Sequence, residues 1–249
     1  MIRGIYTSGS GMLAESLRTD VIANNLANAS TTGYKKDVAV TKDFRSMLIM
    51  RINDGQDRVN IGSLGVGSMV DEVFTDQTPA GATPTGNALD LAIEGPGYFA
   101  VQTPSGIRYT RNGAFTRSSQ GQLVTLEGYP VLGQGGAINL GTPGDTETIT
   151  VSEDGRVLLD NIETDRVRLV SFADSRGLLK EGTNLYTTTQ QEQPAAGIIR
   201  QGALEHSNVN VVAEMVNMIA GYRAYETNAK AVQSHDQLLE KAATEVGRI

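Results

Sequence analysis

The C-terminal segment has the sequence pattern that most restricts the fold of this chain. Apolar or aromatic residues recur there with a 3.5-residue period over five heptads, and ten of eleven such positions fit, Asp236 being the exception. The eleven positions are Val211, Met215, Met218, Tyr222, Tyr225, Ala229, Val232, Asp236, Leu239, Ala243 and Val246. The pattern predicts a helix over 209–246, about 57 Å long at 1.5 Å per residue, with Asn208 or Asn210 as its N-cap. A narrow apolar stripe on so long a helix is typical of a coiled coil and requires a partner helix.

The N-terminal segment supplies a candidate partner helix. Helical spacing links Leu13, Leu17 and Val21, and continues through Ile22 and Leu26. The spacing predicts a helix over 10–30, within an N-terminal helical region spanning 1–34. We expect it to end near Gly33, because glycine readily adopts the left-handed conformation found after helix C-termini. The chain thus has a predicted helix at each end.

Three asparagines interrupt the second half of the N-terminal helix. Asn24, Asn25 and Asn28 are poor helix formers, and at least one lies on or beside the apolar stripe. They form either a solvated face or a set of buried amides that fix the register between packed helices. The sequence leaves both interpretations open.

The middle of the chain, 85–205, has the pattern of a β-rich domain. Short alternating segments are separated by turn signals such as Asn112-Gly113, Gln120-Gly121 and Asp154-Gly155. Turns at this frequency predict an antiparallel barrel or sandwich-like domain. The segment 35–84 has a mixed pattern, and we expect a variable, extended connector. The fold class is therefore α+β, with long N- and C-terminal helices paired as a coiled-coil-like layer and a central antiparallel β domain.

Composition excludes several classes of protein. The chain has 249 residues, of which 39% are hydrophobic, and it contains no cysteine. No apolar stretch approaches the roughly 18 residues of a membrane span, and the first eight residues lack the apolar core of a secretory signal peptide. The net charge is −7, which is unsuited to a nucleic-acid partner or an anionic membrane surface. Both ends are nearly neutral and the middle is acidic, which predicts ends that contact protein.

Catalytic and metal-site patterns are weak. The only histidines, His206 and His235, have no neighbours at ligand spacing, so we expect no metal and no cofactor. Carboxylate pairs such as Asp90 and Glu94 could act in glycoside hydrolysis, although acidic residues at strand edges are usually solvated. Asn28-Ala29-Ser30 fits the glycosylation acceptor pattern but lacks a secretory signal. We therefore expect a protein that is not an enzyme, with a glycan-binding or glycan-cleaving β protein as an alternative.

Three blocks of sequence resemble one known family. The first block is 21–35, VIANNLANASTTGYK; the second comprises 89–99, LDLAIEGPGYF, 109–115, YTRNGAF, and 121–124, GQLV; the third comprises 207–210, SNVN, 214–219, EMVNMI, and 223–226, RAYE. They are similar to the N-terminal, central and C-terminal signatures of bacterial flagellar rod and hook proteins, and they occur in the family's order. The resemblance spans nearly the whole chain.

The resemblance implies a structural role. Hook proteins are much longer, so the length favours a subunit of the hollow rod, the periplasmic drive shaft of the flagellar basal body. The region 45–75 lacks the Gln- and Ser-rich insertion of the distal rod protein, which favours the proximal rod protein, with the distal one as the alternative. The implied partners are copies of this chain, other rod proteins, the surrounding basal-body rings and the flagellar type III export apparatus. Phe44 and Leu48 have the spacing of an export-gate recognition motif, although two apolar anchors of a strand or helix fit equally well.

The resemblance also implies where the assembled subunits would meet. Family members pair their terminal helices and pack them with those of neighbours around the export channel. The side chains expected in this packing are Leu13, Leu17, Val21, Asn24, Asn25, Leu26 and Asn28 in the N-terminal helix, and Val211, Met215, Met218, Tyr222, Tyr225, Val232 and Leu239 in the C-terminal helix. We expect each of them to face the other terminal helix or a neighbouring subunit.

Overall fold

The C-terminal helix has the length that its heptad pattern predicts. In the computed structural model, which describes residues 2–43, 46–51, 59–141 and 148–246, helix α2 spans Val211–Val246. Asn210 is the N-cap: its side-chain Oδ1 accepts a hydrogen bond from Ala213 N at 3.1 Å, and its carbonyl accepts one from Glu214 N at 2.9 Å. The predicted helix is confirmed, and Asn210 is the cap of the two candidates.

The N-terminal helix α1 spans Ile2–Ala27, so the predicted bounds are wrong at both ends. It begins before residue 10, although Gly4, Ser8 and Gly9 are weak helix formers. It ends before Gly33, because Asn28 starts a turn in which its carbonyl accepts a hydrogen bond from Thr31 N at 3.1 Å. Gly33 does adopt a left-handed φ of 66°, but outside the helix.

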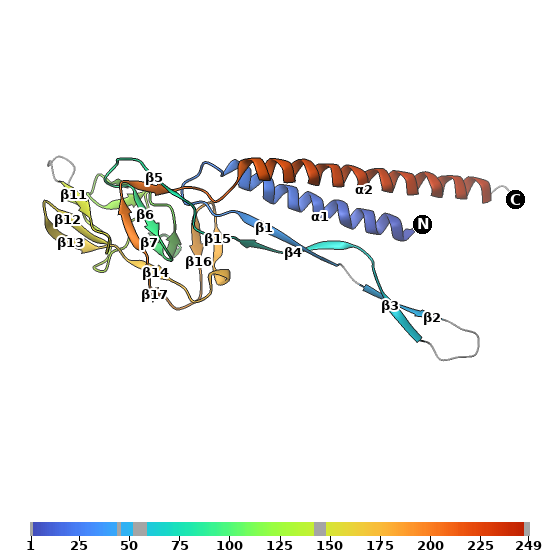
Figure 1. Cartoon of the computed structure of the whole chain (residues 1–249), viewed down its shortest axis with the longest axis horizontal. Helices are drawn as coiled ribbons and strands as arrows, with labels where there is room; N and C mark the ends of the chain where they lie inside the picture. Colours follow the sequence, from blue (N-terminus) through green and yellow to red (C-terminus); the bar gives the residue numbers. More distant parts are fainter. Residues whose placement is uncertain (1, 44–45, 52–58, 142–147, 247–249) are drawn as a thin grey trace. The chain divides into compact units, whose positions relative to one another are not determined.

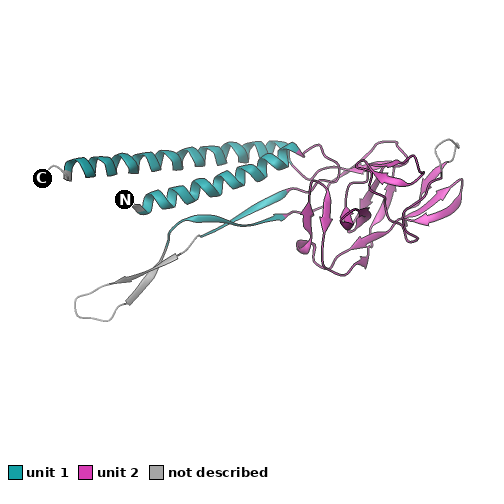
Figure 2. Cartoon of the chain, turned by 180° about the vertical axis from the view of Figure 1, so that it is seen from behind, with its two compact units in different colours: residues 1–27, 37–74, 210–249 teal, residues 28–36, 75–209 magenta. Residues whose placement is uncertain are grey.

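The chain divides into two compact units, shown in teal and magenta in Figure 2. Unit 1 comprises Met1–Ala27, Asp37–Phe74 and Asn210–Ile249, and unit 2 comprises Asn28–Lys36 and Thr75–Val209. The segment 35–84, expected to be an extended connector, is therefore divided between them.

Unit 1 consists of the two terminal helices and two β ladders. Helices α1 and α2 lie side by side and run antiparallel, with Gly4 against His235 and Gly221 against Thr19 (Figure 1). Strand β1 (Asp37–Asp43) pairs with β4 (Ser68–Thr75), and β2 (Ser46–Arg51) pairs antiparallel with β3 (Val59–Gly65). Strand β1 also packs beside α1.

Unit 2 is built from short strands, as the turn frequency predicts. A six-stranded sheet has the order β15-β16-β8-β7-β14-β17, β12 lies between β11 and β13, and the ladders β18-β6, β19-β5 and β10-β9 complete the unit. The strands are β5 (Ala82–Pro84), β6 (Leu91–Glu94), β7 (Tyr98–Thr103), β8 (Gly106–Thr110), β9 (Phe115–Arg117), β10 (Leu123–Thr125), β11 (Ile149–Val151), β12 (Arg156–Leu159), β13 (Ile162–Arg166), β14 (Leu169–Ser171), β15 (Leu179–Glu181), β16 (Leu185–Thr187), β17 (Gln193–Pro194), β18 (Ile198–Gln201) and β19 (Ala203–Glu205), with a 3-10 helix, η1, at Ser175–Gly177. Every ladder whose register is given in unit 2 is antiparallel, which confirms the predicted antiparallel β domain and the α+β fold class.

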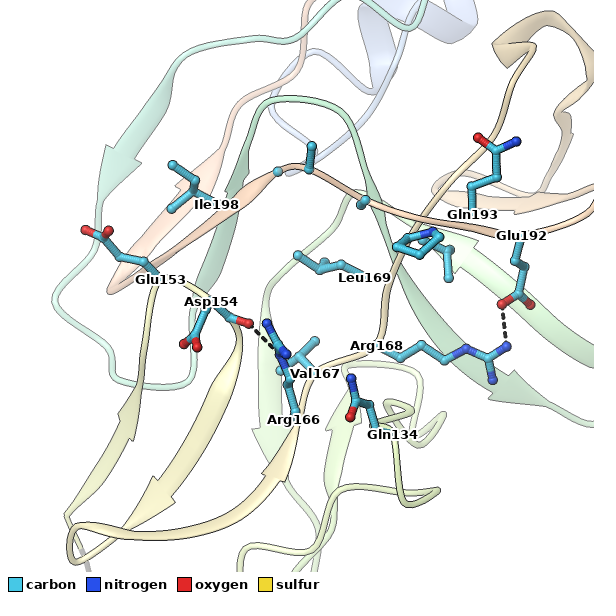
Figure 3. A pocket seen from close by; sticks show the side chains of 15 residues that line it. Gln134, Glu153, Asp154, Arg166, Val167, Arg168, Leu169, Glu192, Gln193 and Ile198 are labelled. Carbon is cyan, nitrogen blue, oxygen red and sulfur yellow. Dashed lines mark hydrogen bonds and ion pairs between the residues drawn. The ribbon is translucent and has the colours of Figure 1, made fainter.

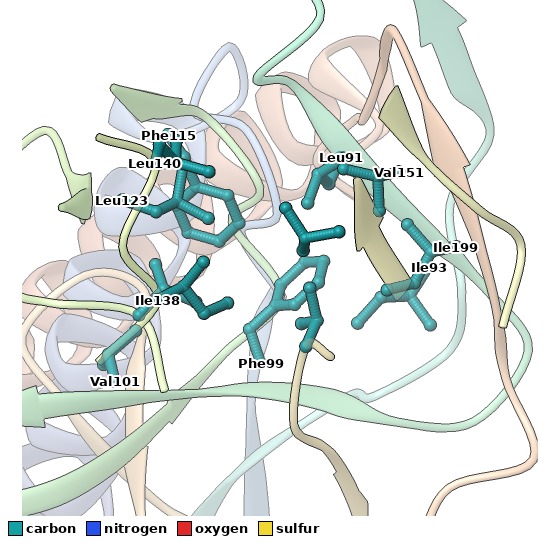
Figure 4. Close-up of a cluster of buried hydrophobic side chains, with 13 residues drawn as sticks. Leu91, Ile93, Phe99, Val101, Phe115, Leu123, Ile138, Leu140, Val151 and Ile199 are labelled. Carbon is teal, nitrogen blue, oxygen red and sulfur yellow. The ribbon is translucent and has the colours of Figure 1, made fainter. Parts of the chain in front are cut away.

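The hydrophobic core of unit 2 has two clusters. Thirteen buried side chains form the first, around Phe99, Val101 and Ile138, as Figure 4 shows. The Phe99 and Phe115 rings pack edge to face with their centroids 5.1 Å apart. The second cluster surrounds Tyr98 and Tyr186. Unit 2 therefore has the buried core expected of a domain that folds by itself.

Candidate functional site

A buried group of three charged side chains lies in unit 2. Lys35, Arg111 and Glu205 have side-chain exposures of 0%, 4% and 3%. The Lys35 ammonium lies 2.6 Å from Glu205 Oε1, and Arg111 Nη1 lies 3.3 Å from Glu205 Oε2. We call these three residues the clasp, because their positions in the sequence are far apart.

Backbone groups satisfy most of the remaining donors and acceptors of the clasp. Lys35 Nζ also donates to Thr78 O at 2.8 Å, and Glu205 Oε1 also accepts from Ala80 N at 3.0 Å. Arg111 Nη2 donates to Gly95 O at 2.7 Å. Burial lowers the pKa of Lys35, and the Glu205 carboxylate opposes that shift. Removal of the Glu205 charge would leave both cations buried without a counter-charge.

The backbone beside the clasp requires glycine at position 33. A Cβ on Gly33 would lie 2.5–2.7 Å from backbone atoms of Arg111 and Asn112, and its φ of 66° is left-handed. Gly33 N donates to Glu205 O at 2.9 Å. The Thr32 hydroxyl donates to Asn112 Oδ1 at 2.8 Å. Gly33 therefore lets two backbone segments approach closely, which is a different reason for glycine from the helix end that the sequence suggested.

Asn208 holds the segment that leads into α2. Its Oδ1 accepts from Lys36 N at 2.7 Å, and its Nδ2 donates to Asp76 O at 2.8 Å. Tyr34, which is 1% exposed, accepts at its carbonyl from Asn208 N at 3.3 Å. The segments that follow α1 and precede α2 are thus both fastened to unit 2.

The clasp and the neighbouring Asn208–Lys36 hydrogen bond bring residues of the three sequence blocks together. Lys35 closes the first block, Arg111 belongs to the second, and Asn208 belongs to the third. Sequence reasoning missed Glu205, whose partners Lys35 and Arg111 are 170 and 94 positions away. The available signal was a carboxylate within the short strand β19, where it is 3% exposed.

Half of the predicted packing residues in the helices of unit 1 are exposed within the chain. In α2, Val211, Met215, Tyr222 and Tyr225 are 38–65% exposed, whereas Met218, Val232 and Leu239 are half-buried. In α1, Leu13 and Leu17 are 64% and 45% exposed, Val21 and Leu26 are half-buried, and Asn24 is exposed. The exposed residues therefore do not face the other terminal helix. For these residues, contact with a neighbouring subunit remains the prediction.

One of the three asparagines is buried. Asn25 is 1% exposed; its Nδ2 donates to Asp37 O at 2.8 Å and its Oδ1 accepts from Asp37 N at 2.9 Å. The buried amide therefore fastens α1 to the start of β1 through both of its hydrogen-bonding groups. Asn24 is exposed and Asn28 is half-buried.

A groove of about 720 Å³ with a mixed polar and apolar lining lies in unit 2, between 166–170 and 192–198 (Figure 3). Arg168 pairs with Glu192, and Arg166 Nε donates to Asp154 O at 2.8 Å. Glu192 also accepts from the Tyr109 hydroxyl at 2.7 Å. No aromatic side chain is among the described residues that line this groove, so it lacks the stacking surface of many sugar sites.

The candidate catalytic carboxylates have structural partners. Asp90 accepts from the Thr85 hydroxyl at 2.6 Å and from Asn87 Nδ2 at 3.0 Å, and Glu94 pairs with Arg200 at 2.9 Å. Across the described ranges, no group of three or more His, Asp or Glu side chains is placed to hold a metal ion. Neither helix in the described part of the chain has a stretch apolar enough to cross a bilayer.

The predicted export motif is only partly covered by the structure. Phe44 lies outside the described residues, and Leu48 lies in strand β2.

Comparison with known families gives three matches along the chain. Residues 5–35 match "Flagella basal body rod protein", residues 92–159 match "Flagellar hook protein FlgE/F/G D1 domain", and residues 200–245 match "Flagellar basal body rod FlgEFG protein C-terminal". The first and third matches cover most of α1 and α2, and the second lies within unit 2.

Similar proteins match over their whole length. The chain is 36% identical to flagellar basal-body rod protein FlgG of Buchnera aphidicola over 261 residues, covering 97% of this chain and 98% of the relative. It is 35% identical to FlgG of Bacillus subtilis over 260 residues, with the same coverage of each chain. It is 36% identical to flagellar basal-body rod protein FlgF of Caulobacter vibrioides over 253 residues, covering 100% of both chains.

Proposed function

Because this chain belongs to the family of flagellar basal-body rod proteins, we propose that it forms the proximal part of the rod and that its exposed helix faces bind neighbouring subunits. The full-length relatives confirm the family that the sequence blocks indicate, and the chain is a structural subunit of the flagellar basal-body rod. Family membership also implies that it assembles with other rod proteins.

The exposure of α2 carries the proposal. In the part of this helix whose burial is described, Gly221 is the only buried residue. A stripe on its first turns, Val212, Val216 and Ile219, is 56–71% exposed, and Met215 and Tyr222 beside it are 48% and 65% exposed. An isolated helix is marginal in water, since most helical stability comes from packing of an apolar face. Such a helix is suited to gain its packing from another subunit.

The gain from covering this face is substantial. Complete burial of one such side chain contributes roughly 1.5–3 kcal/mol, so covering the remaining half of five contributes about 5 kcal/mol. On α1, Tyr6, Leu13 and Leu17 form a second exposed stripe, at 71%, 64% and 45%. Two separate apolar stripes on one subunit allow it to contact two different neighbours, as a helical tube requires.

Alignment length agrees with the lack of an insertion, on which the proposed proximal position rests. The alignment with FlgF of Caulobacter vibrioides covers 253 positions and the whole of both chains. The alignments with FlgG cover 260 or 261 positions but only 97% of this chain, so they contain more gaps. This agrees with the missing insertion in the region 45–75, which distinguishes the expected proximal protein from the distal one.

The remaining parts of the proposal concern export, surroundings and chemistry. We infer that the chain reaches the periplasmic rod through the flagellar type III export apparatus and that it lies inside the basal-body rings. The Phe44-x-x-x-Leu48 spacing and the absence of cysteine support passage as an unfolded chain. We also infer that it has no catalytic activity, which the hydrogen bonds and ion pairs of Asp90, Glu94 and Glu192 support.

The test compares two isoleucines of similar exposure. Ile219→Asp places a charge on the α2 stripe, where Ile219 is 56% exposed, and Ile162→Asp makes the same change in β13, where Ile162 is 71% exposed. Each variant is expressed as the only copy of this protein in a strain from which the native gene has been deleted. We expect Ile219→Asp to abolish swimming in soft agar and rod assembly in isolated basal bodies, and Ile162→Asp to preserve both.

Two controls make the comparison decisive. Near-ultraviolet circular dichroism of both purified variants checks that unit 2 is folded. Export into the culture medium checks that Ile219→Asp is still secreted. Normal rods in the Ile219→Asp strain would refute the assignment of the α2 stripe to subunit contacts.

A further inference from the structure

The face on which α1 and α2 meet contains glycines at three levels. A Cβ on Gly4 would lie within 3.0 Å of three atoms of the His235 imidazole ring. A Cβ on Gly11 would lie 3.0 Å from Asn228 Nδ2. One on Gly221 would lie 3.2 Å from Thr19 Oγ1 and 3.4 Å from Glu15 Oε2. At each level, a polar side chain of one helix thus lies over a glycine of the other.

These contacts define one antiparallel register. From the Gly4–His235 contact to the Gly11–Asn228 contact, the position in α1 advances by seven residues and the position in α2 recedes by seven. A further seven residues along α2 lead from Asn228 to Gly221, where the roles of the helices are exchanged. Seven residues are two helical turns, so the three levels lie on the same face of each helix.

A shift by one heptad loses this fit in either direction. In one direction His235 would pass beyond the start of α1, and Gly221 would face Gly11 with no side chain at that level. In the other direction Asn228 would face Arg18, where no glycine accommodates it. Of these three registers, only the observed one seats both His235 and Asn228 on glycines of α1.

The same face contains polar atoms that lower its stability. Glu15 Oε2 and His235 Nδ1 are buried and have no hydrogen-bond partner among the described residues. The larger apolar side chains Leu13, Leu17 and Ile219 are exposed instead. A polar residue at a helix contact is known to specify register while lowering stability. The composition of this face therefore suits the selection of one alignment.

We propose that Gly4, Gly11 and Gly221, with the side chains seated on them, determine the register in which α1 and α2 of one chain meet. This holds whether or not the apolar stripes bind neighbouring subunits, so it does not rest on the proposed function. The register decides which residues of α2 point away from α1, and so which ones a partner can reach.

The absence of cysteine allows a direct test with paired cysteines in the full chain. Extension of the observed register places Ser8 opposite Ala231, and a shift by one heptad places Ser8 opposite Ala224. One protein therefore carries Ser8→Cys with Ala231→Cys, and a second carries Ser8→Cys with Ala224→Cys. Equilibration in glutathione buffer measures the effective concentration of each thiol pair. We expect a value at least about 10-fold higher for the first pair, since effective concentration depends on geometry.

Variants of the glycines then test their role. Gly4→Leu with Gly11→Leu is expected to reduce the preference to within about 2-fold, because the leucines occupy the space of His235 and Asn228. Gly9→Leu is the matched control in the same helix: a Cβ there has nothing within 4 Å, so the preference should remain. All three changes raise helix propensity, so loss of helix cannot explain a difference between them.

A rescue variant completes the test. Gly4→Ala alone should lower the preference, and addition of His235→Ala should restore it by removing the ring that the new Cβ meets. Equal effective concentrations in the unmodified helices would overturn the proposal. So would a preference that persists in the Gly4→Leu, Gly11→Leu protein, or a Gly4→Ala defect that His235→Ala does not repair.

Discussion

The clasp predicts that Glu205→Gln, which replaces one carboxylate oxygen by an amide nitrogen, causes a large loss of stability in unit 2. The carboxylate of Glu205 accepts hydrogen bonds from Lys35 Nζ at 2.6 Å, from Ala80 N at 3.0 Å and from Arg111 Nη1 at 3.3 Å. A neutral amide of nearly the same shape leaves both cations buried without a counter-charge. Removal of one partner from a buried ion pair usually costs about 3–5 kcal/mol. We expect a loss of about 3 kcal/mol or more in the free energy of unfolding of unit 2.

Urea unfolding of the purified full chain can measure this loss. The buried tyrosines, Tyr34, Tyr98, Tyr109 and Tyr186, all belong to unit 2, so near-ultraviolet circular dichroism follows that unit. The signal at 222 nm reports mainly on the helices. With an m-value of about 2 kcal/mol/M, a loss of 3 kcal/mol lowers the midpoint by about 1.5 M. The m-value should stay unchanged if the unfolding mechanism is the same.

Glu94→Gln is the matched control for this change. Glu94 also pairs with an arginine of unit 2, Arg200, at 2.9 Å, but the two side chains are 45% and 60% exposed. An exposed pair contributes about 1 kcal/mol or less, so the midpoint should move by no more than about 0.5 M. Equal midpoints for Glu205→Gln and Glu94→Gln would refute the reasoning, because burial would then make no difference.

Two further predictions concern the backbone and the pH dependence of unit 2. Gly33→Ala should lower the free energy of unfolding of unit 2 by at least about 3 kcal/mol. Gly86→Ala is the control, because φ there is 77° but a Cβ has nothing within 4 Å, and it should cost only about 1–2 kcal/mol for the left-handed conformation. Equal urea midpoints for the two variants would contradict the close approach at Gly33. Burial raises the pKa of Tyr98 and of Tyr109 from 10.0 to about 12, so the folded state holds these protons more tightly and the stability they contribute is present below pH 10 and lost as the pH rises towards 12. Absorbance at 295 nm should show a component that titrates near pH 12 and disappears in Tyr98→Phe with Tyr109→Phe, and no such component in the unmodified protein would contradict the prediction.

The local sequence pattern was sufficient to predict those elements that are specified by residues close together in the chain. The heptad period of α2 and the capping preference of asparagine predicted Val211–Val246 closely. Turn glycines spaced along 85–205 predicted a domain of short antiparallel strands, because glycine and hairpin geometry act within a few residues.

The same approach failed where tertiary contacts outweigh local preference. It began α1 at residue 10, where the apolar helical spacing starts, whereas the helix begins at Ile2 and includes Gly4, on which His235 is seated. It ended α1 near Gly33, because a glycine after a helix suggests a cap, whereas Gly33 serves a close backbone approach in unit 2. In both places, a distant segment determines the role of the glycine.

The amino-acid sequence alone established two helical ends around a β-rich middle, and the order of the three blocks that identify the family. Periodicity, capping and turn preferences depend on residues close together in the chain, so they can be read without coordinates. The tertiary structure alone decided which face of α2 meets α1 and that Lys35, Arg111 and Glu205 meet. Gly4 and His235 are 231 positions apart and Lys35 and Glu205 are 170 apart, and nothing in the local pattern of a lone carboxylate in β19 specifies its partners.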